Sequence, residues 1–136
     1  MREAIGSSWL IYMVMTFIMV YVFFISFIMN YAAAYRAANY VVTQIEYCQG
    51  RMDECKSMAT IANEVTDRYH YHPKNGKIDA CYSMNGSNSY VFRVSMPVTF
   101  ELPILGDMGV AVVTAETKTI ANVPNVTSIN GIVKCS

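Results

Sequence analysis

Charged residues are missing from a long stretch near the start of this 136-residue chain. Between Ala4 and Tyr35 there is no Asp, Glu, Lys or Arg, so this stretch cannot form the solvated face of a surface helix. Over the whole chain the 10 acidic and 10 basic residues balance, with no run of one sign. A protein that binds nucleic acid needs a basic surface to neutralise phosphates, so we expect no nucleic-acid partner.

Catalytic and cofactor-binding motifs are absent as well. The sequence has no G-x-S-x-G, no P-loop and no G-x-G-x-x-G. Its carboxylates are scattered, and His70 and His72 supply two ligands where a closed zinc site takes about four. The sequence therefore predicts no enzyme, no cofactor and no metal site.

The most informative feature of the sequence is the uncharged stretch from Ala4 to Tyr35. It is longer than the roughly 20 residues that cross a bilayer and longer than the roughly 7 to 15 apolar residues of a cleaved signal peptide. It continues into the Ala-rich residues 32–38, which favour helix. We predict one hydrophobic helix over about residues 4–47. Its uncharged part would be about 48 Å long against a hydrocarbon core of about 30 Å, so something besides lipid is expected to bury the excess.

The remainder, residues 48–136, is predicted to be a separate small α+β domain. Apolar residues at spacings of three and four predict a second, short helix within Arg51–Tyr69. A loop with Pro73 and an Asn-Gly pair follows. The period then changes to two, which predicts an antiparallel sheet of about three strands at Ile78–Met84, Tyr90–Phe100 and Val110–Ala121. Pro97 lacks a backbone donor, so its strand should have an edge or a bulge there.

All four cysteines follow the hydrophobic stretch. An even count in a small domain predicts two disulfides and a location outside the cytoplasm. Three connectivities are possible, and we favour Cys48–Cys55 with Cys81–Cys135. Residues seven apart on one continuous helix are about 10 Å apart along its axis, so this pairing requires the helix to break near Gly50.

Two short motifs match the acceptor pattern for N-glycosylation. They are Asn85-Gly86-Ser87 and Asn125-Val126-Thr127. The alternative for both is an ordinary role in turns and loops, and Asn85-Gly86 is itself a turn signal.

The C-terminal pattern resembles that of a known family. The alternating segment Tyr90–Phe100, the Pro-containing break Leu102–Gly106 and the strand Val112–Glu116 together resemble the ending of TadE-like proteins of tight-adherence pilus systems. The whole architecture is similar to that of pilins and pseudopilins.

The resemblance implies a structural subunit whose hydrophobic helix first lies in the bilayer and then packs with copies of itself in an extracellular filament, with the pilus assembly machinery as a further partner. It also implies that Glu3 neutralises the amine of a neighbouring subunit. The alternative for Glu3 is an exposed charge flanking a membrane helix. The residues expected to pack between subunits are Glu3, Trp9, Phe17, Tyr21, Phe24, Ala33 and Ala37.

Two other functions remain open at this point. The hydrophobic helix can be a plain signal anchor, in which case the chain is a single-pass accessory subunit of a secretion, pilus or conjugation apparatus that never polymerises. An exported enzyme or metal-binding domain is a more distant alternative.

Overall fold

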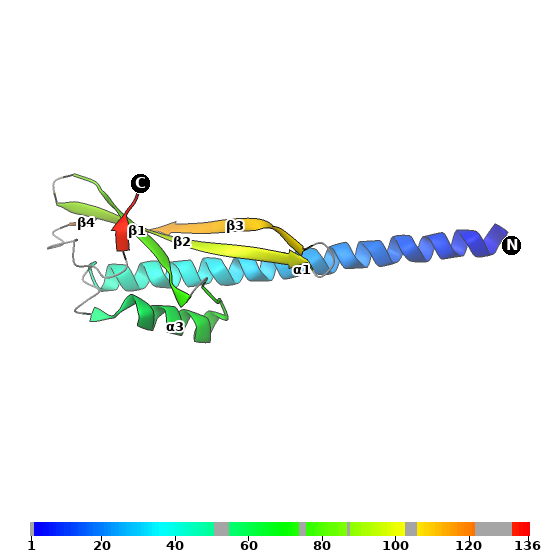
Figure 1. The fold of residues 1–136 in the computed structure, drawn as a ribbon, viewed down its shortest axis with the longest axis horizontal. Coiled ribbons are helices and arrows are strands. Elements are labelled where there is room, and N and C mark those ends of the chain that lie inside the picture. The colour runs from blue at the N-terminus through cyan, green and yellow to red at the C-terminus, as the bar shows by residue number, and fades with distance from the viewer. Residues whose placement is uncertain (1, 51–54, 74–75, 87, 103–105, 122–131) are drawn as a thin grey trace. The chain divides into compact units, whose positions relative to one another are not determined.

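The chain has the α+β fold class that its sequence predicts. The structure, a computed structural model, describes residues 2–50, 55–73, 76–86, 88–102, 106–121 and 132–136 (Figure 1). It contains a long helix, a short helix and a five-stranded sheet. The chain divides into two compact units, Met1–Asn30 and Tyr31–Ser136. Each unit is described by itself below.

Helix α1 covers Arg2–Tyr47, 46 residues, close to the predicted range. It ends in a Schellman motif, which satisfies the last free carbonyls of a helix. Gln49 adopts a left-handed conformation with φ 50°, and the N–H of Gly50 donates to the carbonyl of Ile45 at 3.1 Å. The predicted break near Gly50 is thereby confirmed.

Helix α3 covers Met58–Tyr69 and is shorter than the predicted helix, which began near Arg51. Its start is set by Ser57, whose side chain accepts a hydrogen bond from the N–H of Thr60, because such a cap satisfies an otherwise free donor of the first turn. Ile61, Ala62 and Val65 form its buried face. Residues 51–54, where the prediction placed the first turn, lie outside the described residues.

The sheet contains β1 (Asp79–Met84), β2 (Ser89–Leu102), β3 (Gly106–Glu116), β4 (Ile120–Ala121) and β5 (Ile132–Lys134). The order is β3-β2-β1-β5, and β4 also pairs with β2. The three predicted strands correspond to β1, β2 and β3, which pair antiparallel. The prediction missed β5, which pairs with β1 in parallel and makes the sheet mixed.

Strand β2 has the predicted alternation. Phe92, Val94, Met96 and Val98 are all buried on one face. Pro97 pairs with Val112 of β3, but the pairing of β2 with β1 ends at Ser95. Because the N–H of Thr117 donates to the carbonyl of Phe92 and hydrogen-bonding sides alternate along a strand, the backbone of Pro97 faces the open edge. The predicted edge at Pro97 is confirmed, and the irregularity in the register lies further on, between Phe100 and Glu101.

The predicted strand Val110–Ala121 is longer at its start and interrupted near its end. Strand β3 begins at Gly106 and ends at Glu116, and β4 resumes at Ile120. At the interruption the buried side chain of Thr117 accepts a hydrogen bond from the N–H of Phe92 at 3.0 Å. The Thr117 side chain thus takes the place of a backbone carbonyl as the partner of the Phe92 N–H, and the predicted strand is divided at this point into β3 and β4.

The second half of α1 is a core element of the Tyr31–Ser136 unit. Figure 1 shows the sheet and α3 alongside this part of α1. The buried side chains of α1 in this unit are Ala34, Ala37, Ala38, Val41, Val42 and Ile45. They pack in one cluster with residues of α3, β1, β2, β3 and β5. The globular unit therefore begins inside the helix, whereas the sequence placed the domain boundary at residue 47.

Both disulfides have the favoured pairing. Cys48 is bonded to Cys55 at the end of α1. Cys81 of β1 is bonded to Cys135 just after β5, so the second bridge holds the C-terminal strand against the sheet.

Candidate functional site

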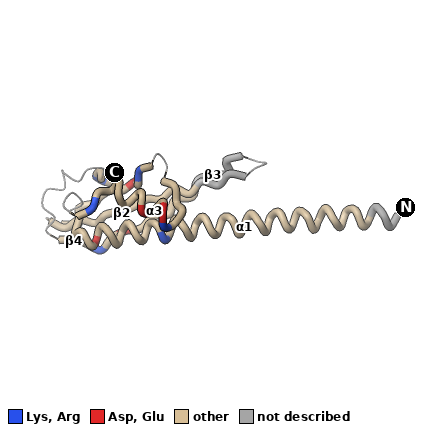
Figure 2. Tube along the Cα trace, turned by 90° about the horizontal axis from the view of Figure 1, so that it is seen from below, with Lys and Arg blue, Asp and Glu red and all other residues tan. Residues whose placement is uncertain are grey.

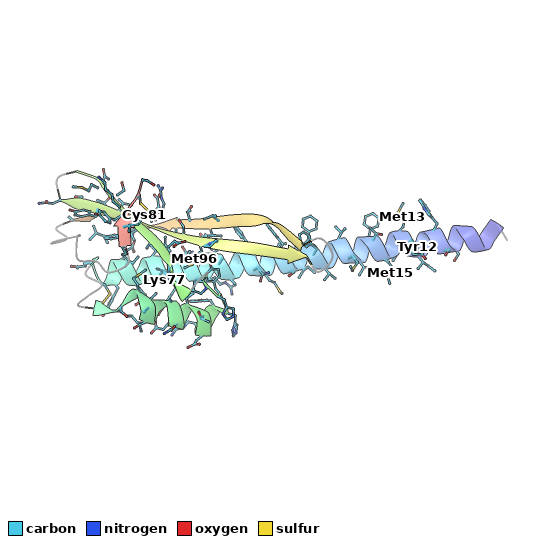
Figure 3. The ribbon with its side chains drawn as sticks, viewed as in Figure 1. Tyr12, Met13, Met15, Lys77, Cys81 and Met96 are labelled. Atoms are coloured by element: carbon cyan, nitrogen blue, oxygen red, sulfur yellow. A yellow bond between two sulfur atoms is a disulfide. The ribbon has the colours of Figure 1, made fainter. Side chains whose placement is uncertain are left out.

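The most unusual surface of this chain is the apolar side of α1 in the Met1–Asn30 unit. Large hydrophobic side chains are exposed all round the helix there. Trp9 is 64% exposed, Phe17 71% and Phe24 56%. Figure 3 shows Tyr12, Met13 and Met15 projecting from the helix in different directions. An exposed apolar surface of this extent marks a contact with a membrane or a protein.

Charged residues are absent from this apolar surface and occur in the other unit. Figure 2 shows no charged residue along the described residues 6–35 of α1, whereas Lys, Arg, Asp and Glu are spread over the unit that begins at Tyr31. The span Gly6–Tyr47 is long and apolar enough to cross a membrane. A helix with these properties occurs both in membrane anchors and in signal sequences.

The length available to a membrane is shorter than the sequence suggests. From Tyr31 onward α1 lies in the globular unit, which leaves Gly6–Asn30 as the described apolar part. At about 1.5 Å per residue these 25 positions measure about 38 Å, against a hydrocarbon core of about 30 Å. The segment thus spans a bilayer with about 8 Å to spare, rather than the larger excess predicted.

A few polar side chains interrupt the apolar surface. The hydroxyl of Thr16 donates to the carbonyl of Tyr12 at 2.9 Å, so it is satisfied within the helix. Tyr21 is 68% exposed, and Ser26 and Asn30 are exposed too. Among the residues that the structure describes, none of these three side chains has a hydrogen-bond partner.

The predicted packing residues do not all belong to this surface. Trp9, Phe17, Tyr21 and Phe24 do. Ala37 does not, because it is fully buried in the core of its own globular unit, and its assignment to contacts between subunits is corrected. Ala33 is half-buried. Glu3 lies in the first turn of α1, and its side chain is outside the described part.

A polar cluster that sequence reasoning missed joins α1 to α3. The hydroxyl of Tyr40 donates to Glu64 Oε2 at 2.6 Å, and the Lys56 ammonium pairs with the same oxygen. The guanidinium of Arg68 lies over the Tyr40 ring, 5.4 Å from its centroid. Hydrogen bonds from Lys56 and then from Tyr40 lower the pKa of the Glu64 carboxyl. The same bond to Glu64 raises the pKa of Lys56.

This cluster is structural in character. The carboxylate of Glu64 is paired with the Lys56 ammonium, the Arg68 guanidinium lies on the Tyr40 ring, and all four members are at least partly exposed. Within the described residues there is no group of three or more His, Cys, Asp or Glu side chains that can hold a metal ion.

A groove of about 710 Å³ lies on the globular unit. Its lining is mostly apolar and comes from the first turn of α3, from β1 with the residues before it, and from single residues of β2 and β5. Lys77 and Asp79 are its charged residues. One Lys and one Asp beside an apolar wall do not form an acid–base or nucleophile–base pair.

Comparison with known proteins adds no identification. No family model, no curated protein and no solved structure matches this chain. The exposed apolar surface of Gly6–Asn30 is the feature of this chain that points to a function.

Proposed function

We propose that this chain is a pilin-like structural subunit, similar to TadE-like proteins, that polymerises through α1 into an extracellular filament for adhesion or contact. The observation that carries the proposal is the exposure of Trp9, Phe17, Tyr21 and Phe24 on an uncharged helix. This surface is covered by lipid before assembly and by the helices of other copies afterwards. Helices associate in lipid through packing and hydrogen bonds between them.

The globular unit supports the rest of the proposal. Its two disulfides are stable in an oxidising compartment, outside the cytoplasm. Its core is completed by the second half of α1, the same helix whose first half would enter the filament. A disulfide-bonded unit of this kind suits the outside of a fibre.

A second function, a single-pass accessory subunit that never polymerises, is favoured by one observation. The apolar part Gly6–Asn30 is about 38 Å long, which is close to what one tilted membrane span requires. An anchor of that length needs no filament to cover it. The two functions make opposite demands on Glu3, because an anchor tolerates its replacement and a filament of this kind does not.

The test is negative-stain electron microscopy of material sheared from the native cells, with mass spectrometry of any fibres to identify their subunits and first residue. We expect fibres composed mainly of this chain. Glu3→Ala should abolish them while leaving the chain in the membrane fraction, and Glu3→Asp serves as the control that keeps the charge. If the wild-type chain stays in the membrane fraction and no fibres form, the accessory function takes its place.

A further inference from the structure

In the second half of the Met1–Asn30 unit, three polar side chains, those of Tyr21, Ser26 and Asn30, have no partner among the described residues and lie on two different sides of α1. At about 100° per residue, Asn30 is about 180° round the helix from Tyr21, and Ser26 is about 140° from it. Each of the three groups can both donate and accept a hydrogen bond. In residues 21–30, one side of the helix thus carries a phenol, and the other side carries a hydroxyl and an amide.

Tyr21 is poorly placed for a helix surrounded only by lipid. A layer of about 30 Å centred on Gly6–Asn30 puts Tyr21 about 5 Å from its midplane and about 10 Å from the nearer interface. Tyrosine is enriched at membrane interfaces, where its hydroxyl reaches water. A hydroxyl in hydrocarbon without a partner is costly, and the described part of this chain provides no partner for it.

We propose that the Tyr21 side of one copy packs against the Ser26–Asn30 side of the next, so that Tyr21 hydrogen-bonds to Ser26 or Asn30 of the neighbouring copy. This inference rests on the proposed function and specifies its contact. The occupant is a second copy in the same orientation, because all copies insert the same way and carry the complementary groups on the opposite side.

Two consequences follow from the geometry. The contact joins unlike surfaces, and a contact of this kind repeats from copy to copy rather than closing into a pair. Ser26 and Asn30 lie five and nine residues after Tyr21, so neighbouring helices are displaced along their axes by about 8 to 14 Å. A symmetric dimer, by contrast, would bring each residue against itself.

Engineered cysteines distinguish the two arrangements, because the native cysteines are all paired. Val14 and Met19 are exposed and lie one heptad before Tyr21 and Ser26, on nearly the same two sides. With Val14→Cys and Met19→Cys in one chain, mild oxidation of sheared fibres should give a ladder of cross-linked oligomers, and mild oxidation of membranes should give dimers, because the displacement along the axis adds up from copy to copy and a bilayer is only about 30 Å thick. Each single variant should give no dimer.

The hydrogen bond is tested on the same ladder. Tyr21→Phe removes only the hydroxyl and should lower the cross-linked yield by about 3- to 15-fold, as a hydrogen bond between membrane helices does. Ser26→Ala with Asn30→Leu should have a similar effect, and adding Tyr21→Phe to that pair should change little further. Tyr12→Phe is the matched control, because Tyr12 is only about 9 Å from Gly6 along the axis.

Dimers from the single-cysteine variants, or a yield that Tyr21→Phe leaves unchanged, would overturn the proposal. If Val14→Cys with Met19→Cys prevents insertion, Ser7→Cys with Tyr12→Cys, two heptads before the proposed contact, replaces it.

Fibres without a ladder leave the filament standing and reject the contact of Tyr21 with Ser26. The pair Val14→Cys with Phe23→Cys, nine residues apart, tests the contact with Asn30 in the same way, and the absence of both ladders rejects the proposal. Cross-linked dimers in membranes of the double-cysteine variant, without fibres, support the contact and reject the filament.

Discussion

At the scale of single residues, the globular unit is held by a few polar contacts at the margins of an apolar core. In the described residues no buried side-chain nitrogen or oxygen lacks a hydrogen-bond partner. Tyr71 and Thr117 are two examples. The side chain of each forms a hydrogen bond with a backbone group of β2 that no neighbouring strand pairs with. Tyr71 donates to the carbonyl of Pro97 at 2.8 Å, on the edge that β1 leaves open.

Replacing Tyr71 tests this contact. Tyr71→Phe keeps the buried ring and should lower the free energy of unfolding by about 0.5–1.5 kcal/mol at neutral pH, the usual net value of one hydrogen bond. Burial, and then the negative charge of Asp79, raise the pKa of Tyr71 above its ordinary value. Its stabilising contribution is therefore complete below about pH 10 and is lost as the pH rises through the higher folded value.

The measurement is thermal unfolding of the full chain in mild detergent, followed by circular dichroism across alkaline pH. The wild type should lose stability as Tyr71 ionises, and the Phe variant should lose less. Parallel curves for the two proteins would contradict the assignment. Tyr47→Phe is the control, since Tyr47 is 80% exposed.

The Glu64 cluster predicts a dependence at the other end of the pH scale. Because the bonds from Lys56 and Tyr40 lower the pKa of Glu64, its contribution to stability is present above the ordinary carboxyl range and is lost as the pH falls through the folded value. Glu64→Gln should therefore be less stable than the wild type at neutral pH, and the difference should shrink below about pH 4. The effect should be small, because the pair is partly exposed to water.

The same unfolding assay in acid checks this prediction. Asp67→Asn is the matched control, since Asp67 lies on the same helix and is exposed. A difference between Glu64→Gln and the wild type that persists unchanged in acid would show that the charge of Glu64 is not what stabilises the contact.

At the scale of elements, sequence pattern was a good guide where one period is sustained. The uncharged run gave α1, and the alternation of β2 gave the sheet face that packs on it. The pattern failed where a local contact overrides the period. Ser57 starts α3 later than its apolar spacing suggests, and the hydrogen bond from Phe92 to Thr117 divides one expected strand into β3 and β4.

The candidate site was predictable in part for the same reason. Composition alone marks Trp9, Phe17, Tyr21 and Phe24 as members of an apolar surface. Composition cannot show which part of a uniform helix its own chain will cover, so Ala37 was placed on the wrong surface. Strand β5 was missed in part because three residues are too few to show a period, and the α1–α3 cluster because its members are far apart in sequence.

The two disulfides should differ in their effect on stability. A bridge stabilises mainly by restricting the unfolded chain, and more so for a longer loop. Cys81–Cys135 closes a separation of 54 residues and Cys48–Cys55 one of 7. Replacing Cys81 and Cys135 with Ala should cost about 4 kcal/mol, and replacing Cys48 and Cys55 about 2.5 kcal/mol.

Thermal unfolding of the two double-alanine variants under non-reducing conditions provides the comparison. The reverse order would mean that the shorter bridge acts chiefly on the folded state, through the angle at which the chain leaves α1. In that case Gly50→Ala, which strains the left-handed turn at φ 72°, should be destabilising to a similar degree.

At the scale of the whole molecule, one helix has two environments. Its second half is buried by the chain's own sheet and α3, and its first half presents apolar side chains outward. If the helix were only an anchor, the size and shape of its apolar side chains could vary along that first half, because lipid adapts to any apolar surface. A filament imposes a tighter condition, since each side chain must then fit a neighbouring helix.

Phe17→Arg separates these conditions. Apart from Phe17, Gly6–Asn30 contains eleven Leu, Ile, Val and Phe residues, which together favour insertion by about 3 to 7 kcal/mol, whereas one Arg at the centre opposes it by about 2.5 to 3.5 kcal/mol. Insertion should therefore survive the change. An Arg between closely packed helices has no water and no partner, so the yield of sheared fibres should fall by at least about tenfold, a cost of about 1.4 kcal/mol or more per contact.

Membrane fractionation and fibre yield are measured on the same cells, with Phe17→Leu as the control that keeps the side chain apolar. Loss of both insertion and fibres would mean that the helix is a weaker membrane segment than its composition indicates. Full insertion with a normal yield of fibres would place Phe17 outside the fibre core, and the helix surface facing away from Phe17 would then have to make the contacts between copies.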